Sequence, residues 1–373
     1  MKYGLVLAGG GVRGAYQVGV WKALREMSID ICAVAGASIG SVNGALFVQG
    51  DIEKAERLWK GIDLEDIVSL PEKINNADNL FNIGNITELI REMHRNDGLD
   101  ISPLENLLNS VIDESKITIS PIDFGIAAFS VTNHSEIYKF KADIPKGKMV
   151  EYIVASACIP GFKPKKIGKN RLLDGGMSDN MPVNMLLDKG IRNIITVDVK
   201  GIGVYRSFNT AGKNIIDISC KNPQTGLMEF DRDGIERNII EGYLDCMRIF
   251  GRLEGDIYCI SDYRRARMNY SAELIASLEK AAKVFDVDTL RVYTVHELIS
   301  ETMSAYYNFD QKSDDINEKS VFEKIRNLDD NAVTTWLVKI LESGRSDFLL
   351  DKLSVIGKNY DAACAIMYFK QEK

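Results

Sequence analysis

The chain has 373 residues, 45% of them hydrophobic and 27% charged, a balance that argues against global disorder. Its 46 basic and 53 acidic side chains give a formal charge of −7, so the overall charge does not favour nucleic acid or an anionic bilayer as partners. No apolar run reaches the roughly 18 residues of a transmembrane helix, and glycines interrupt the apolar N-terminus, so no signal peptide is expected. The six cysteines are scattered, which predicts reduced thiols in a cytoplasmic protein.

The first fifty residues alternate between two kinds of pattern. An apolar run at residues 3–8 predicts a buried strand, and residues 20–27 repeat apolar side chains at helical spacing. A second apolar run at residues 31–35 ends at Gly36, and helical spacing returns at residues 42–46. This strand–helix–strand–helix series predicts a parallel sheet that is covered by helices.

The rest of the chain shows three different sequence patterns. Residues 62–120 are irregular and partly Asn-rich, and we expect a mostly helical insertion whose residues 67–90 either form a mobile lid or pack on the core. Further strands are predicted from apolar runs at residues 122–129, 137–140, 194–199, 215–219 and 257–260. Helical patterns dominate the C-terminal part, so the predicted domains are residues 1–263 and a helical region of residues 264–373.

A glycine-rich segment, GGGVRG at residues 9–14, follows the first predicted strand and opens the first helix. It satisfies the dinucleotide pattern GxGxxG, which alone is weak evidence. Glycines allow backbone N–H groups to approach an anion, and a helix N-terminus adds a favourable dipole. The anion is either a pyrophosphate or an oxyanion that exists only during a reaction. A tight turn without any ligand explains the pattern equally well.

The second predicted strand ends in GASIG, residues Gly36, Ala37, Ser38, Ile39 and Gly40. A dinucleotide site needs an acidic residue at this point, whereas GxSxG between a strand and a helix is the context of a nucleophile elbow. The flanking glycines relieve crowding in the turn that exposes the serine hydroxyl. Because both loops follow strands of one right-handed crossover, the amides of residues 9–14 are expected to face Ser38.

A nucleophilic serine needs a base, and the chain has only three histidines. His94 lies in a charged segment and His134 in a polar turn, whereas His296 is the one that follows the order Ser, Asp, His of many hydrolases. A triad that uses His296 is therefore one alternative.

A carboxylate is the other candidate base. Asp174 ends a short apolar run and is followed by Gly175 and Gly176. We expect an Asp at a strand end to emerge at the same sheet edge as Ser38. Because Asp is a weak base, it would need desolvation or constrained geometry to accept the serine proton. A Ser-Asp dyad would also explain why histidine is scarce.

Together, GGGVRG at 9–14, GASIG at 36–40 and DGG at 174–176 resemble the patatin-like phospholipases. The likeness extends to VNGA at 42–45 and ASACIPGFKPKKI before Asp174, and it covers residues 3–200 well. It implies a three-layer α/β/α fold with a mainly parallel central sheet, followed here by a C-terminal helical annex. It also implies a Ser38–Asp174 dyad that cleaves acyl esters through an acyl-enzyme without metal or cofactor. The implied oxyanion hole comes from Gly9, Gly10, Gly11, Val12, Arg13 and Gly14.

The predicted function is therefore a lipid acyl hydrolase of the phospholipase A or lysophospholipase type. Its substrate is a phospholipid or another acyl-ester lipid, with transient membrane contact left open and no nucleic acid expected. A basic run at residues 163–171 (Lys163, Lys165, Lys166, Lys169 and Arg171) either meets lipid phosphates or is a solvated loop. The alternatives are an esterase with a His296 triad, a dinucleotide-binding oxidoreductase, and a non-catalytic lipid-binding or scaffold protein.

Overall fold

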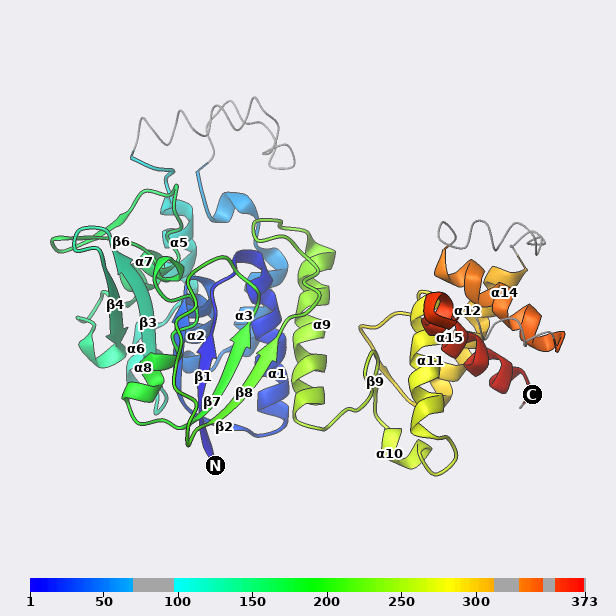
Figure 1. The fold of residues 1–373 in the computed structure, drawn as a ribbon. Coiled ribbons are helices and arrows are strands. Elements are labelled where there is room, and N and C mark those ends of the chain that lie inside the picture. Colours follow the sequence, from blue (N-terminus) through cyan, green and yellow to red (C-terminus); the bar gives the residue numbers. More distant parts are fainter. Residues whose placement is uncertain (70–96, 312–328, 345–352, 372–373) are drawn as a thin grey trace. The chain divides into compact units, whose positions relative to one another are not determined.

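A computed structural model describes residues 1–69, 97–311, 329–344 and 353–371 (Figure 1). The chain divides into two compact units, Met1–Cys246 and Met247–Lys373, and this division lies ahead of the boundary that the sequence predicts near residue 264. One reason is that β9 (Cys259–Ile260) pairs with β10 (Val292–Tyr293) in a small sheet of its own. The expectation that residues 257–260 extend the main sheet is therefore wrong.

The first unit contains a mainly parallel sheet, as the sequence predicts. Its path runs β5-β6-β3-β2-β1-β7-β8, and β4 also pairs with β3. The pairs β1–β2, β2–β3, β1–β7 and β7–β8 are parallel, whereas β3–β4, β3–β6 and β5–β6 are antiparallel. The strands are β1 (Lys2–Leu7), β2 (Asp30–Ala37), β3 (Asp123–Ser130), β4 (Ser135–Phe140), β5 (Lys165–Ile167), β6 (Asn170–Asp174), β7 (Asn193–Asp198) and β8 (Asn214–Ser219).

Helices of the first unit follow the strands in the predicted alternation. The short ones are η1 (Gly11–Gly14), η2 (Leu64–Asp66), η4 (Lys141–Asp143) and η5 (Gly175–Met177). The α-helices are α1 (Ala15–Glu26), α2 (Ile39–Gln49), α3 (Ile52–Gly61), α5 (Ser102–Val111), α6 (Glu114–Ile119), α7 (Met149–Ser156), α8 (Val183–Asp188) and α9 (Arg232–Ile249). The described ends of the predicted insertion are helical at η2, α5 and α6. Most of the predicted lid, and His94, lie outside the described residues.

Alternating side chains of β2 show how the sheet is covered on two faces. Ala33, Ala35 and Ala37 belong to one apolar cluster with residues of α8. Val34 points to the other face, where Gly44 of α2 packs against it. Successive side chains of a strand point to opposite faces, so the sheet lies between two helical layers. This is the predicted three-layer α/β/α arrangement.

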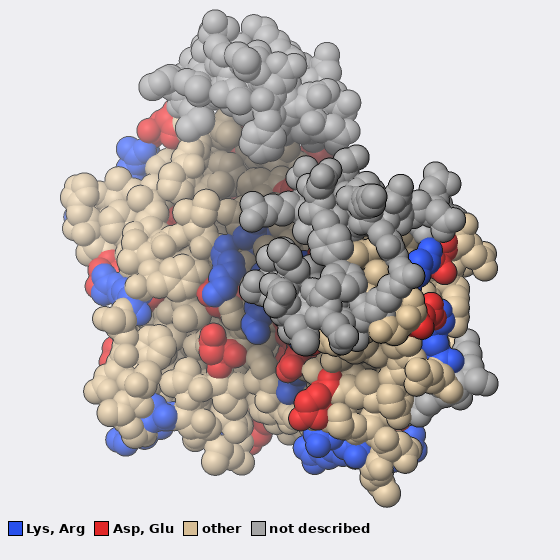
Figure 2. Space-filling model, turned by 45° about the vertical axis from the view of Figure 1, so that its right-hand side comes forward, with Lys and Arg blue, Asp and Glu red and all other residues tan. Residues whose placement is uncertain are grey.

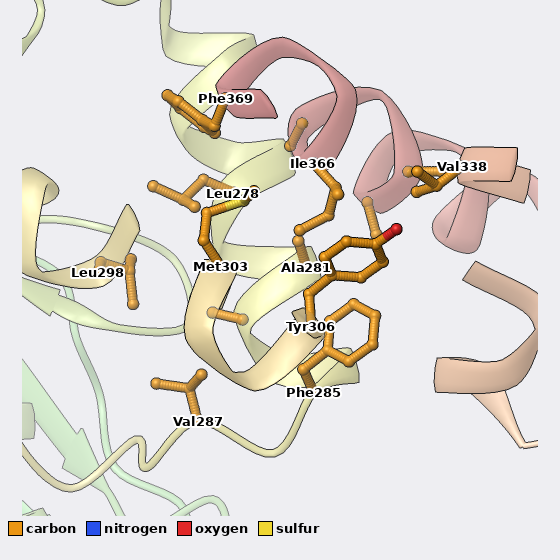
Figure 3. Packing of buried hydrophobic residues seen from close by; sticks show 14 of the residues in the cluster. Leu278, Ala281, Phe285, Val287, Leu298, Met303, Tyr306, Val338, Ile366 and Phe369 are labelled. Carbon is orange, nitrogen blue, oxygen red and sulfur yellow. The ribbon is translucent and has the colours of Figure 1, made fainter. Parts of the chain in front are cut away.

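The second unit is mainly helical, as the sequence predicts. Its helices are α10 (Tyr263–Ala266), α11 (Ala272–Val284), α12 (Val295–Asp310), α14 (Asp330–Glu342) and α15 (Leu353–Gln371). Figure 3 shows their shared apolar core, in which Leu278, Phe285, Tyr306 and Ile366 converge. The Phe285 and Tyr306 rings meet edge to face, with centroids 5.5 Å apart. Among the described residues, no helix is both long enough and apolar enough to cross a bilayer.

Candidate active site

Ser38 lies in the sharp turn where β2 ends and α2 begins. Its backbone angles, φ 53° and ψ −130°, lie outside the regions that side-chain-bearing residues normally adopt, a conformation that typically costs about 1–3 kcal/mol. The two motif glycines make this turn sterically possible. A Cβ atom at Gly36 would collide with the Gly40 carbonyl, and one at Gly40 would collide with the Leu7 carbonyl of β1.

Hydrogen bonds from two other serines hold the turn. The Ser38 N–H donates to Ser156 Oγ at 2.9 Å, and that hydroxyl donates to the Ala127 carbonyl of β3 at 2.6 Å. The Ser38 carbonyl accepts from Ser41 Oγ at 2.7 Å. The strained backbone is therefore fixed from α7, β3 and α2 at the same time.

Asp174 reaches Ser38 through strand register. In the parallel pair β2–β3, Ala37 lies opposite Ala127, and in the antiparallel pair β3–β6, the next residue, Ala128, lies opposite Asp174. The sequence-based expectation treats β6 as a parallel strand, and this is wrong because β6 is antiparallel to β3. The strand runs antiparallel to β3, so its last residue lies opposite Ala128, one strand away from the end of β2 where Ser38 follows.

The Asp174 carboxylate is buried, with 5% of the residue exposed. Burial raises its pKa to about 6, and the Ser38 hydroxyl and the Gly176 N–H limit the rise because they stabilise the charged form. Oδ1 accepts the Gly176 N–H at 2.7 Å. Oδ2 has no well-formed hydrogen bond within the described part of the chain, which leaves this atom available to a proton.

The backbone amides of residues 9–14 are not equivalent. The Gly9 N–H donates to the Asn180 carbonyl at 3.0 Å, and the Val12 N–H donates to the Leu227 carbonyl at 2.9 Å. Gly10 and Gly11 both line the cavity that contains Ser38. Among the described residues that lie outside η1, no backbone carbonyl accepts a hydrogen bond from their N–H groups. Of the predicted oxyanion donors, Gly10 and Gly11 are thus the ones that line this cavity and donate to no other loop among the described residues.

The remaining members of the glycine-rich segment have packing roles. The Arg13 guanidinium donates hydrogen bonds to the carbonyls of Thr225 and Lys200, both at 2.9 Å. The Gly14 carbonyl accepts from Asn43 Nδ2 at 2.9 Å. Arg13 thus tethers two loops and is not directed at Ser38.

Two cavities meet at Ser38. The first is apolar, has a volume of about 90 Å³ and is bounded by α2, α3 and α5. Its walls include Val42, Leu58, Trp59, Ile62, Leu104, Leu108 and Phe162. The second has a volume of about 460 Å³ and is lined by Gly10, Gly11, Asp174, Gly176 and Asn180 together with apolar rim residues.

The other described candidate residues, namely two histidines and the basic run, are not among those that line the two cavities at Ser38. His296 is exposed on α12 of the second unit, and His134 is exposed in the turn between β3 and β4. In the basic run, Lys165 pairs with Glu105 at 2.5 Å and Arg171 pairs with Asp97. Lys163, Lys166 and Lys169 are exposed, as expected for a solvated run. On the face that Figure 2 shows, basic and acidic side chains are interspersed among wide uncharged areas.

Residues 5–187 match the family model described as patatin-like phospholipase, and this range contains both Ser38 and Asp174. This part of the chain belongs to the patatin-like phospholipase family. The recognition made from the three motifs is confirmed, and so is the fold class that it implied.

The patatin-like domain is similar to several curated proteins. Patatin-like phospholipase domain-containing protein 7 of Rattus norvegicus is 28% identical over 199 residues, which cover 52% of this chain and 13% of that protein. Lysophospholipase NTE1 of Cryptococcus neoformans is 30% identical over 213 residues, 53% of this chain and 11% of that protein. The chain thus spans little more than a tenth of their length. A solved structure, VipD from Legionella pneumophila, aligns with a TM-score of 0.44 and 16% identity over 98% of this chain and 90% of that one.

The patatin-like domain also contains a buried residue that sequence reasoning missed. Asn180 Nδ2 donates to the Gly9 carbonyl at 3.1 Å, while the Asn180 carbonyl accepts the Gly9 N–H. The same side chain donates to the Tyr205 hydroxyl at 3.1 Å. Asn180 therefore joins the loop after Asp174 to the glycine-rich loop. Its position six residues after Asp174 was visible in the sequence, but its partner Gly9 was not.

Proposed function

We propose that the chain hydrolyses acyl esters of lipids, with Ser38 as the nucleophile and Asp174 as the general base. The observation that carries this proposal is the position of the two side chains. Both line the larger, open cavity, and Ser38 also lines the apolar cavity that adjoins it. The apolar cavity suits the first carbons of an acyl group, and the open cavity has room for the rest of a lipid.

The reaction would begin when Ser38 Oγ attacks the ester carbonyl carbon and its proton passes to Asp174. The negative charge that develops on the carbonyl oxygen would be stabilised by the Gly10 and Gly11 N–H groups, and a single such donor typically contributes about 3–4 kcal/mol. Asp174 would then return the proton to the departing alkoxide, which leaves an acyl-Ser38 ester. In the second half, Asp174 takes a proton from water as the hydroxide attacks the acyl carbonyl carbon. Asp174 then returns the proton to Ser38 Oγ as the acyl–oxygen bond breaks, which releases the fatty acid and restores the dyad.

The raised pKa of Asp174 suits this role. With a pKa of about 6, the carboxylate is mostly ionised at pH 7 and accepts a proton more readily than an ordinary Asp. The base must be deprotonated, so kcat/KM should rise with pH through this value. Another buried carboxylate, Asp179, accepts a hydrogen bond from the Tyr138 hydroxyl at 2.7 Å and is not among the residues that line the two cavities.

Lysophospholipids and phospholipids are the substrates that we propose first, because relatives of the patatin-like domain are named lysophospholipases and phospholipase-domain proteins. In the present conformation the apolar cavity has room only for the first carbons of a chain, since it is smaller than the roughly 150 Å³ of an engineered cavity that binds benzene. We also expect the protein to be cytoplasmic, because none of the six cysteines forms a disulfide bond.

The test is release of fatty acid from lysophosphatidylcholine, from phosphatidylcholine vesicles and from a soluble short-chain ester, measured by mass spectrometry. We expect release by the native chain and by His296→Ala, and loss of release in Ser38→Ala and Asp174→Asn. Equal release by Ser38→Ala would contradict the proposal, whereas loss in His296→Ala would favour a triad.

A further inference from the structure

Apolar side chains are exposed around the mouth of the open cavity. Ile202 is 86% exposed and Val204 49%, both in the connection between β7 and β8. Met177 and Met228 add two further apolar tips, at 40% and 36% exposure. All four line the cavity that reaches Ser38. Single exposed apolar residues are ordinary, but a group around one opening marks an interaction surface.

The loop that carries this surface is fixed in place. We call residues 200–206 the rim loop. Its Val204 N–H donates to the Gly176 carbonyl at 2.8 Å, and its Val204 carbonyl accepts the Asn180 N–H at 2.6 Å. The Tyr205 hydroxyl donates to Asp198 Oδ1 at 3.0 Å. These bonds tie the backbone of the rim loop to the segment after Asp174 and to the end of β7.

Cationic side chains stand at both ends of the rim loop. Lys200 pairs with Asp198 at 2.9 Å and Arg206 pairs with Glu136 at 3.0 Å, yet both side chains stay substantially exposed. Interactions with these carboxylates contribute to raising the pKa of each, so both remain charged at neutral pH. At a lipid surface the cationic side chains would lie near the phosphates, and the exposed apolar side chains would contact the acyl chains below them.

We propose that the rim loop, with Met177 and Met228, docks the patatin-like domain onto a phospholipid surface, so that lipid enters the cavity directly from the bilayer. This inference rests on the proposed function, because a lipid surface is the occupant that supplies an acyl ester at this opening. Exposed apolar side chains with Lys200 and Arg206 beside them, at the opening of a cavity that reaches Ser38, favour a phospholipid surface over a protein partner.

Sedimentation with vesicles tests the docking without requiring activity. The parent protein is Ser38→Ala, and the vesicles contain equal amounts of phosphatidylcholine and phosphatidylglycerol. Ile202→Ser is compared with Ile119→Ser, which alters an equally exposed isoleucine at the end of α6 (81% exposed). We expect Ile202→Ser to lower the partition coefficient about tenfold, because the buried area of one isoleucine is lost, and Ile119→Ser to leave it unchanged.

The outcomes separate docking from catalysis. Equal partitioning of the two isoleucine variants, or a parent that does not bind vesicles, would overturn the docking surface and would point to a protein partner or to none. Hydrolysis of the soluble short-chain ester by the native chain is measured in parallel and tests the proposed function alone. In otherwise native protein, Ile202→Ser should lower vesicle hydrolysis relative to soluble-ester hydrolysis by a similar factor.

Discussion

The proposed nucleophile, Ser38, and the proposed base, Asp174, are each placed in an unfavourable state, but the unfavourable energy has a different origin at each residue. At Ser38 the cost is conformational, because φ is 53° at a residue with a side chain. At Asp174 the backbone is relaxed, with φ −48° and ψ 133°, and the cost is electrostatic because burial raises the pKa of the carboxyl group. Close packing around the motif glycines maintains the backbone conformation of Ser38, and exclusion of water maintains the raised pKa of Asp174. A different substitution therefore relieves each unfavourable energy. The gain in the free energy of unfolding should depend on pH for Asp174 but not for Ser38.

The largest expected effect comes from removing the Ser38 hydroxyl. Ser38→Ala and Ser38→Gly should each lower kcat by at least about 10⁴-fold, because both lack the nucleophile. They should differ in stability. Glycine accepts a positive φ more readily than alanine. The free energy of unfolding of Ser38→Gly, measured by urea denaturation, should therefore be about 1 kcal/mol higher than that of Ser38→Ala at any pH. Equal stability of the two variants would contradict a strained turn.

Asp174→Asn should lower kcat/KM by about 10²–10⁴-fold, since it removes a general base. It should also stabilise the protein. The pKa of Asp174 rises from 3.8 to about 6 on folding, so the native carboxyl stabilises the fold when protonated, and this contribution is lost as pH rises from about 4 to 6. The variant should therefore be more stable above pH 6, by up to about 3 kcal/mol, with the gain vanishing below pH 4.

Asp179→Asn serves as the matched control for that experiment. Asp179 is also buried, and burial raises its pKa, but its carboxylate faces the Tyr138 hydroxyl. We expect Asp179→Asn to keep more than a tenth of the native kcat/KM. A loss as large as that of Asp174→Asn would show that activity depends on the whole loop and not on one carboxylate.

Asn180→Ala should have a smaller effect on catalysis. It leaves the Gly9 carbonyl without its donor and loosens the loop that carries Gly10 and Gly11, so we expect kcat to fall about 10²-fold at most, with KM little changed. Asn184→Ala is the control, because the Asn184 side chain donates to the exposed Ser207 carbonyl and not to the glycine-rich loop. A fall in stability alone, with kcat retained, would restrict Asn180 to a structural role.

Ser156→Ala should have the smallest effect. It removes the acceptor of the Ser38 N–H, and we expect about a tenfold loss of kcat together with about 1–3 kcal/mol of stability. Ser110→Ala, at an exposed position in α5, removes a comparable hydroxyl and should change neither. Native activity in Ser156→Ala would show that the elbow holds its geometry without this bond.

The sequence predicts those parts of the site that are local in the chain. The elbow at residues 36–40 follows from a strand, two glycines and a helix in succession, and the structure has all of them. The direction of β6 depends on pairing with β3, more than forty residues earlier, so sequence patterns do not reveal it. Likewise, the amides of Gly9 and Val12 are occupied by carbonyls of Asn180 and Leu227, which only the fold brings near.

The measurement that tests the dyad most directly is the rate of covalent labelling by a fluorophosphonate probe as a function of pH, with the modified residue identified by mass spectrometry. The dyad predicts one labelled residue, Ser38, and a rate that rises with pH around an apparent pKa of about 6. Labelling should be absent in Ser38→Ala and slow in Asp174→Asn, without the same rise. Labelling at another serine, or a pH profile that survives Asp174→Asn unchanged, would contradict the account.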